Sequence, residues 1–229
     1  MIAIPMTVLT AAAVAVSVFA GPAHADSGVV LGGGSGIVLN DHDVCTLTTI
    51  GHDEAGRLVG LTAGHCAGPG ESVAAERDRG AGVLGRVAAV NKDLDYAVIE
   101  FDPAKVAAVR QVGDTTIAGL GAYPGPGGVV CENGRSTGFD CGVVWGSLGD
   151  RVLNQTCSRP GDSGGPVTEG DRLVGMNNGR VVGFGGIDMN IECTTAANPI
   201  HSPAYNHQIT DILRAIDAGG GVGAGFTPV

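Results

Sequence analysis

One serine of the sequence stands in a setting that suits a nucleophile. Ser163 lies in the run Gly161-Asp162-Ser163-Gly164-Gly165-Pro166, a few residues after Cys157. Glycines on both sides let the backbone turn tightly and let a ligand approach its N–H groups. A serine that attacks a carbonyl carbon needs an exposed Oγ and backbone donors aimed at the carbonyl oxygen. Taken alone, Gly-Asp-Ser would favour a surface turn over a nucleophile.

Two further segments contain the side chains that a serine nucleophile needs. A hydroxyl is a weak nucleophile until a neighbouring imidazole accepts its proton, and a buried carboxylate best holds that imidazole in one tautomer. His65 follows an apolar segment and precedes Cys66, and Asp95 opens the apolar segment 96–101. Singly, His65 would pass for a strand-end histidine and Asp95 for a turn residue. Together with Ser163 they stand in one of the few chain orders in which catalytic triads occur.

The composition predicts an all-β scaffold for these residues. Glycine accounts for 40 of the 229 residues and charged residues for only 16%, which favours short strands joined by tight turns over long helices. A break rich in proline and glycine at 123–128 predicts two β units, 26–122 with His65 and Asp95, and 123–229 with Ser163. Apolar residues spaced i, i+3, i+4, i+7 predict one helix over 206–217. The glycine-rich tail after it is expected to be loose.

The first 25 residues are expected to be a signal peptide. Residues 2–20 are almost wholly apolar, and Ala23-His24-Ala25 has the form of a cleavage site. The lack of a Lys or Arg before the apolar run leaves a retained membrane anchor as the alternative. Export would make the six cysteines a disulfide framework. The net charge of −10 argues against binding to nucleic acid, which favours a basic face.

Three motifs resemble those of the chymotrypsin-fold serine proteases, and most closely those of the secreted bacterial branch that includes α-lytic protease and the streptogrisins. Thr62–Cys66 resembles the histidine motif, Asp95–Val98 the aspartate segment, and Gly161–Pro166 the serine motif. The resemblance runs from about Val44 to Ile216. It implies two six-stranded antiparallel β-barrels with a C-terminal helix. It also implies a secreted serine endopeptidase, extracellular or at the cell envelope, that acts on polypeptides.

The resemblance also implies a role for individual residues, following the established template of this family. Ser163 would be the nucleophile, His65 the general acid and base, and Asp95 the group that orients the imidazolium. The N–H groups of Gly161 and Ser163 would form the oxyanion hole. The residues expected to line the substrate site are Ser158, Arg159, Pro160, Met176, Asn177, Asn178 and Gly179.

The family pattern further implies a set of disulfides and a chain that works without a cofactor. No two cysteines have Cys-x-x-Cys spacing and the remaining histidines form no metal-spaced cluster, so no metal is expected. A monomer without a membrane span after removal of the signal is expected. The implied disulfides are Cys45–Cys66, Cys131–Cys141 and Cys157–Cys193.

One position departs from the pattern of the bacterial enzymes. Many of them have an arginine after the first cysteine of a segment like Val130–Phe139, and it pairs with the buried aspartate before the nucleophile. Here that position is Glu132. A buried charge without a partner is costly. We therefore expect Arg135 to pair with Asp162 and Glu132 to point to water, with Arg159 competing for Asp162.

Two other functions compete with that of a protease. A catalytically silent chymotrypsin-fold module that binds at the cell surface would keep the triad residues but lack an ordered oxyanion loop, because of Glu132. An esterase of the α/β-hydrolase type is disfavoured, because that fold has the order Ser, Asp, His. No acidic residue suits a trypsin-type specificity pocket, so we expect a preference for small or medium apolar side chains, with Arg159 as a rim charge.

Overall fold

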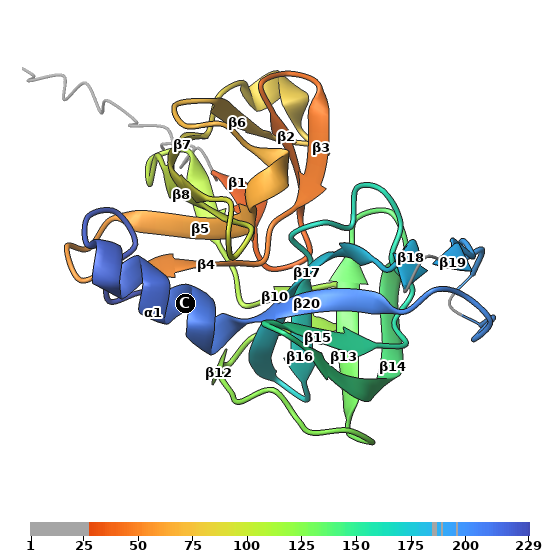
Figure 1. The fold of residues 1–229 in the computed structure, drawn as a ribbon. Helices are drawn as coiled ribbons and strands as arrows, with labels where there is room; N and C mark the ends of the chain where they lie inside the picture. Colours follow the sequence, from red (N-terminus) through yellow and green to blue (C-terminus); the bar gives the residue numbers. More distant parts are fainter. Residues whose placement is uncertain (1–27, 185–186, 189, 196) are drawn as a thin grey trace, which may run out of the picture.

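The computed structural model describes residues 28–184, 187–188, 190–195 and 197–229, and the expected signal peptide lies outside these ranges. Two β halves lie side by side, and a helix packs along one side of them (Figure 1). The fold is all-β apart from this helix and two short 3₁₀ turns, η1 (Gly64–Cys66) and η2 (Arg79–Ala81). The predicted fold class is therefore confirmed.

The N-terminal half is a curved antiparallel sheet of eight strands in the order β21-β4-β5-β8-β7-β6-β2-β3. It is open in this order and includes a strand from the C-terminus, so it differs from the closed six-stranded barrel that was expected. The central strands β5 and β8 are almost completely buried, and Ala63 at the end of β5 pairs with Tyr96 at the start of β8. The residues just beyond these two ends therefore emerge together at one edge of the sheet. The strands are β2 (Gly36–Leu39), β3 (Asp43–Thr46), β4 (Thr49–His52), β5 (Leu58–Ala63), β6 (Ser72–Ala75), β7 (Gly85–Asn91), β8 (Tyr96–Phe101) and β21 (Thr227–Pro228).

The C-terminal half is a closed barrel of six antiparallel strands. The order β17-β16-β13-β14-β15-β20 closes because β17 also pairs with β20. The loop between β15 and β16 contains Ser163, and a short strand, β12, pairs in parallel with β17. The strands are β12 (Gly119–Leu120), β13 (Val129–Gly134), β14 (Gly138–Leu148), β15 (Arg151–Asn154), β16 (Pro166–Glu169), β17 (Arg172–Arg180) and β20 (Ala204–Gln208).

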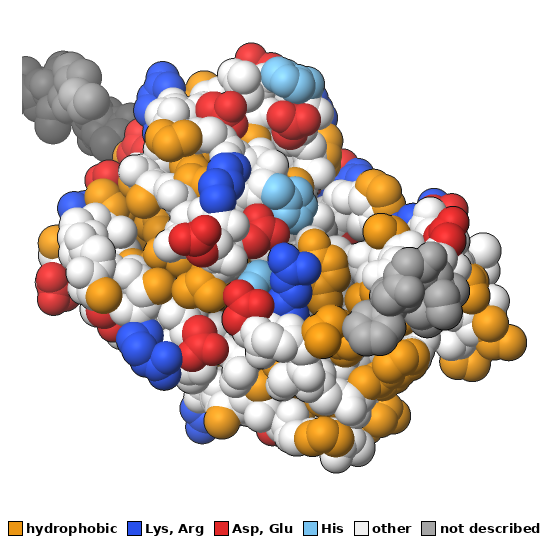
Figure 2. Space-filling model, in the orientation of Figure 1, with side chains coloured by type: hydrophobic (Ala, Val, Ile, Leu, Met, Phe, Trp, Pro, Cys, Tyr) orange, Lys and Arg blue, Asp and Glu red, His pale blue; other side chains and the backbone are white. Residues whose placement is uncertain are grey.

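Three small two-stranded pairs complete the fold. They are β1 (Val29–Leu31) with β9 (Val106–Ala108), β10 (Gln111–Val112) with β11 (Thr115–Thr116), and β18 (Gly183–Phe184) with β19 (Ile187–Asp188). On the face in Figure 2, charged side chains of both signs are interspersed, and hydrophobic side chains are exposed mainly over the C-terminal half. Alternate residues of β14 point outward, which leaves Trp145 52% exposed.

The helix and the tail differ from the sequence prediction. Helix α1 spans Ile209–Gly219, not 206–217, because residues 206–208 belong to β20, which pairs with both β15 and β17. The tail, expected to be loose, turns back and adds β21 to β4. Positive φ angles at Gly220 and Gly223, 63° and 95°, allow this reversal, and Phe226 packs into the core at 6% exposure.

Candidate active site

His65 and Asp95 meet at the sheet edge where β5 ends and β8 begins. Asp95 Oδ2 lies 2.8 Å from His65 Nδ1, and Asp95 Oδ1 accepts the backbone N–H of His65 at 2.6 Å. The Gly64 N–H also donates to the carbonyl oxygen of Asp95 at 2.9 Å. A carboxylate can only accept from Nδ1, so the Nδ1 proton is fixed there and Nε2 is left as the acceptor. The His65 side chain is 46% exposed, so Nε2 is accessible.

Asn178 of β17 holds Asp95 from the other side. Its Nδ2 donates to the carbonyl oxygen of Asp95 at 2.8 Å and to Oδ2 at 3.0 Å. Its Oδ1 accepts from the backbone N–H and from Nδ1 of His207, both at 3.1 Å, which fixes the amide orientation. The sequence prediction had placed Asn178 in the substrate site and had no role for His207. Burial raises the pKa of Asp95. The hydrogen bond from His65, the charge of the His65 ring and the hydrogen bond from the Asn178 amide outweigh this effect, so the pKa of Asp95 lies below its usual value.

The nucleophile loop lies directly against the strands that lead to His65. Thr46 donates its N–H to the Ser163 carbonyl at 2.9 Å and its hydroxyl to the Gly161 carbonyl at 2.8 Å. Thr48 Oγ1 donates to the Gly164 carbonyl at 2.6 Å. Gly164 has φ +86°, and a Cβ there would collide with Thr46 and Thr62, so only glycine fits.

Two backbone donors of this loop, within the described residues, are free to bind a ligand. The N–H groups of Gly161 and Ser163 have no hydrogen-bond acceptor among the residues that the structure describes. Within the same residues, no hydrogen bond joins Ser163 Oγ to His65 Nε2. Such bonds are often long without substrate and tighten when the substrate binds. Among the described residues, the loop therefore holds a half-buried Ser163 beside two N–H groups, those of Gly161 and Ser163, that have no acceptor.

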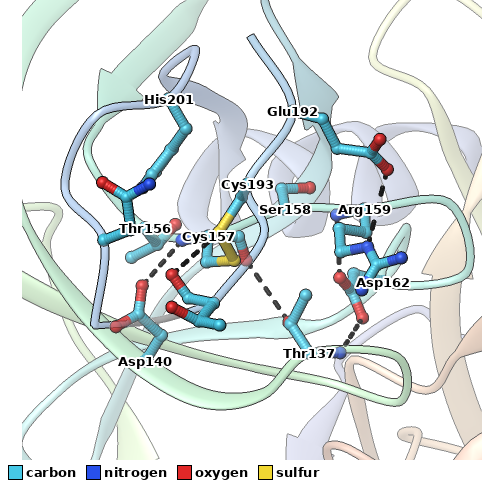
Figure 3. The surroundings of a disulfide bond; sticks show 12 residues. Thr137, Asp140, Thr156, Cys157, Ser158, Arg159, Asp162, Glu192, Cys193 and His201 are labelled. Carbon is cyan, nitrogen blue, oxygen red and sulfur yellow. Dashed lines mark hydrogen bonds and ion pairs between the residues drawn. A yellow bond between two sulfur atoms is a disulfide. The ribbon is translucent and has the colours of Figure 1, made fainter.

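Asp162 is held by backbone N–H groups and not by an arginine (Figure 3). Its side chain accepts from Ser136 at 2.7 Å, Thr137 at 3.0 Å and Arg159 at 2.8 Å. Burial raises the pKa of Asp162 above its usual value, and these three bonds offset only part of that rise. The expected side-chain partners are engaged elsewhere, in the ion pairs Arg135–Glu76 and Arg159–Glu192.

The position of Glu132 also differs from the one expected from the sequence. It is 1% exposed and points into the C-terminal barrel instead of to water. Because side chains alternate along a strand, Glu132 shares the inner face of β13 with Val130, which is 0% exposed. Oε2 lies 2.8 Å from Thr156 Oγ1, and Oε1 accepts from Asn177 Nδ2 at 2.5 Å. The pairing of Arg135 with Asp162 and the exposure of Glu132 were thus both wrong.

The other residues assigned to the substrate site differ in accessibility. Arg159 and Pro160 are exposed and Gly179 is half-buried. Ser158 is 2% exposed, and its hydroxyl accepts from Asn177 Nδ2 at 2.8 Å. Met176 is completely buried in the hydrophobic core, so its side chain faces no substrate in this structure.

The three disulfides expected from the resemblance are present and surround the site. Cys45–Cys66 joins β3 to the residue after His65, and Cys131–Cys141 links β13 to β14. Cys157–Cys193 ties the start of the nucleophile loop to the segment after β19 (Figure 3). In the described part of the chain, no group of three or more His, Cys, Asp or Glu side chains is arranged to hold a metal ion, and no helix has the length and apolarity to cross a membrane.

Comparison with known sequences gives distant relatives. No protein-family model matches the chain. The uncharacterized protein Rv1815 of Mycobacterium tuberculosis strain H37Rv is 31% identical over 150 residues, and MT1863 of strain CDC 1551 gives the same values. The matches cover 57% of this chain and 63% of the relatives, which is less than two thirds of their length.

Comparison with solved structures gives similar folds over most of the chain. The Nocardiopsis protease NAPase has a TM-score of 0.63 at 21% identity, covering 82% of this chain and 96% of that protease. A glutamic acid-specific serine protease that uses a histidine triad in substrate binding has a TM-score of 0.64 at 22% identity, covering 88% and 100%. Cellulomonas bogoriensis chymotrypsin has a TM-score of 0.61 at 24% identity, covering 81% and 95%.

Proposed function

We propose that this chain, which has the chymotrypsin fold of bacterial serine proteases, is a secreted serine endopeptidase that forms an acyl-enzyme on Ser163. The observation that carries the proposal is the orientation of His65 by Asp95, beside a glycine-rich loop with two unpaired N–H groups. The three disulfides support export, because such bonds persist in oxidising compartments.

The mechanism that this geometry supports has two steps. In the first, Ser163 Oγ attacks the carbonyl carbon of the scissile peptide and its proton passes to His65 Nε2. Asp95 stabilises the resulting imidazolium, and the N–H groups of Gly161 and Ser163 bind the oxyanion. His65 then protonates the leaving amine, and in the second step it activates the water that hydrolyses the ester. Each oxyanion donor is worth about 2.7–4 kcal/mol in such sites.

A fluorophosphonate probe tests this proposal, since it reacts only with an activated serine. The disulfide-bonded wild type should be labelled and Ser163→Ala should not. His65→Ala should lower the labelling rate by at least about a thousandfold, since triad members act as a unit. Cleavage of a peptide library by the wild type then defines the preferred side chain, for which we predict a small or medium apolar residue.

The competing function is a catalytically silent binding module at the cell surface. The lack of a hydrogen bond from Ser163 Oγ to His65 within the described residues is compatible with it, but such bonds are often long in an active enzyme without substrate. A folded wild type that neither reacts with the probe nor cleaves any library peptide would establish this alternative and rule out the protease.

A further inference from the structure

The contacts of Glu132 form a buried polar chain that connects the barrel interior to the nucleophile loop. Asn177 Nδ2 donates to Glu132 Oε1, to Ser158 Oγ at 2.8 Å and to the Asp162 carbonyl at 3.4 Å. The Asn177 backbone continues this link, because its carbonyl accepts the Gly164 N–H at 2.7 Å and its N–H donates to the Gly165 carbonyl at 2.9 Å. Glu132 is therefore connected, through Asn177, to Asp162 and Gly164, the two residues that flank Ser163.

The orientation of the neighbouring amides follows from their other partners. Asn177 Oδ1 accepts the Gly179 N–H at 3.0 Å, so Nδ2 is the atom that faces Glu132. Asn154 Oδ1 accepts the Thr156 N–H at 2.8 Å, and Asn154 Nδ2 donates to the Tyr123 hydroxyl at 2.9 Å. Asn154 Oδ1 is therefore an acceptor only.

Thr156 Oγ1 lies between two oxygen atoms, and the number of protons there decides the state of Glu132. It is 2.7 Å from Asn154 Oδ1 and 2.8 Å from Glu132 Oε2. Two such short contacts need two protons, and the Thr156 hydroxyl supplies one. The amide oxygen of Asn154 has none to give, so the second proton belongs to the Glu132 carboxyl.

The charges around Glu132 agree with a neutral acid. The groups that face it are Asp162 from the nucleophile loop, Asp140 from β14, and Tyr123 from the segment before β13. None of these is a cation, and the two nearby arginines are paired with Glu76 and Glu192. Burial, followed by the charges of Asp162 and Asp140, raises the pKa of Glu132 well above its usual range.

We propose that Glu132 is a positioning residue that acts in its protonated form, holding Asn177 and, through it, the backbone on both sides of Ser163. Neutral hydrogen bonds thus replace the arginine–aspartate pair expected at this place. That Glu132 affects the reactivity of Ser163 rests on the proposed function. Ionisation would bury a negative charge beside Asp162 and leave two oxygens in contact without a proton between them, which disfavours the ordered loop.

Glutamine at position 132 separates this role from simple packing. Its amide keeps an acceptor for Asn177 and a donor for Thr156, but it cannot ionise. We expect the labelling rate of the wild type to fall about tenfold per pH unit above the Glu132 pKa, and that of Glu132→Gln to show no such fall. Glu132→Ala should be slow at every pH. Glu169→Gln, which changes an exposed carboxylate on β16, is the matched control and should follow the wild type.

Thermal unfolding in a Ser163→Ala background tests protonation without catalysis. The raised folded-state pKa means that the folded chain keeps a proton that the unfolded chain releases above about pH 4.3. Stability must therefore fall as pH rises from there to the folded-state pKa. The unfolding midpoint of Ser163→Ala should fall over this range more than that of the Ser163→Ala, Glu132→Gln double variant.

The outcomes separate this inference from the proposed function. If the labelling rate and the unfolding midpoint depend on pH in the same way with Glu and with Gln at position 132, Glu132 does not act in a protonated form. A midpoint difference without a difference in the labelling profile keeps the protonation but overturns the link to Ser163. Lack of labelling at any pH overturns the protease and that link, while the midpoints still decide the protonation state.

Discussion

The amide of Asn178 joins Asp95 to a second layer of buried polar side chains. Because a hydrogen bond to a charged group contributes about 1.5–3 kcal/mol, Asn178→Ala should lower kcat/KM by about 10- to 150-fold. The loss should fall on kcat more than on KM, since in the proposed mechanism Asp95 acts through His65 and does not touch the substrate. Rates of peptide cleavage over a range of substrate concentrations measure this split.

Two controls make the Asn178 prediction specific. Asn198→Ala removes an exposed asparagine from a loop and should leave kcat/KM unchanged. The unfolding midpoint of Asn178→Ala must stay above the assay temperature, so that the loss reflects positioning and not unfolding. A rate within twofold of the wild type would show that Asp95 does not need this amide.

At the residue scale, local motifs predicted that His65 and Asp95 belong to one site, but not the residues that support them. The bonds of His65 to Asp95 connect positions whose neighbours are distinctive in sequence. Glu132 was misjudged because a carboxylate was assumed to seek water, although the inward position of Val130 on the same strand indicated the opposite. His207 lies behind Asp95 through strand pairing of β20 with β17, which no local pattern indicates.

At the scale of elements, the C-terminal tail completes the N-terminal sheet. Phe226 is 6% exposed and belongs to the main core, and the Gly223 N–H donates to the buried Asp53 at 3.0 Å. Phe226→Ala should therefore lower the free energy of unfolding by about 3–5 kcal/mol. Thr227→Ala, at an exposed neighbouring position, should change it by less than about 0.5 kcal/mol. Denaturant unfolding of both variants in the Ser163→Ala background gives the comparison, and equal values would contradict the role of the tail.

The same tail shows where element prediction failed. The helix was found approximately because its apolar periodicity is local. The glycines from 219 to 225 were interpreted as flexibility, but several have positive φ and build a reversal. Whether glycine marks a turn or a loose end depends on what the following residues contact, and here β4 lies about 175 residues earlier in the chain. Such a contact is not visible in a local window.

At the scale of the whole molecule, the nucleophile loop belongs to one half and is held by the other. Thr46 and Thr48, both 0% exposed in the N-terminal half, bond the carbonyls of Gly161, Ser163 and Gly164. The family resemblance carried by the motifs predicted the fold class, but the role of these threonines was not predicted. Their importance arises only when the halves are packed together, so the candidate site depends on the whole fold.

Thr46→Val tests this dependence, because it removes one hydroxyl and keeps the shape of the side chain. The hydroxyl donates to the Gly161 carbonyl and accepts the Arg135 N–H at 3.0 Å, so the variant leaves two backbone groups without their partner. Each such group costs about 1–3 kcal/mol when buried, and each kcal/mol lowers the melting temperature by about 2–4 °C for a chain of this size. Because the N–H of the same residue, Gly161, is one of the two proposed oxyanion donors, we expect labelling of Ser163 to slow as well. Thr115→Val is the matched control, since Thr115 Oγ1 is buried and has no hydrogen-bond partner in the described part of the chain, and it should be neutral or stabilising. If Thr46→Val behaved like Thr115→Val in melting and labelling, the loop would hold its geometry without the Thr46 hydroxyl.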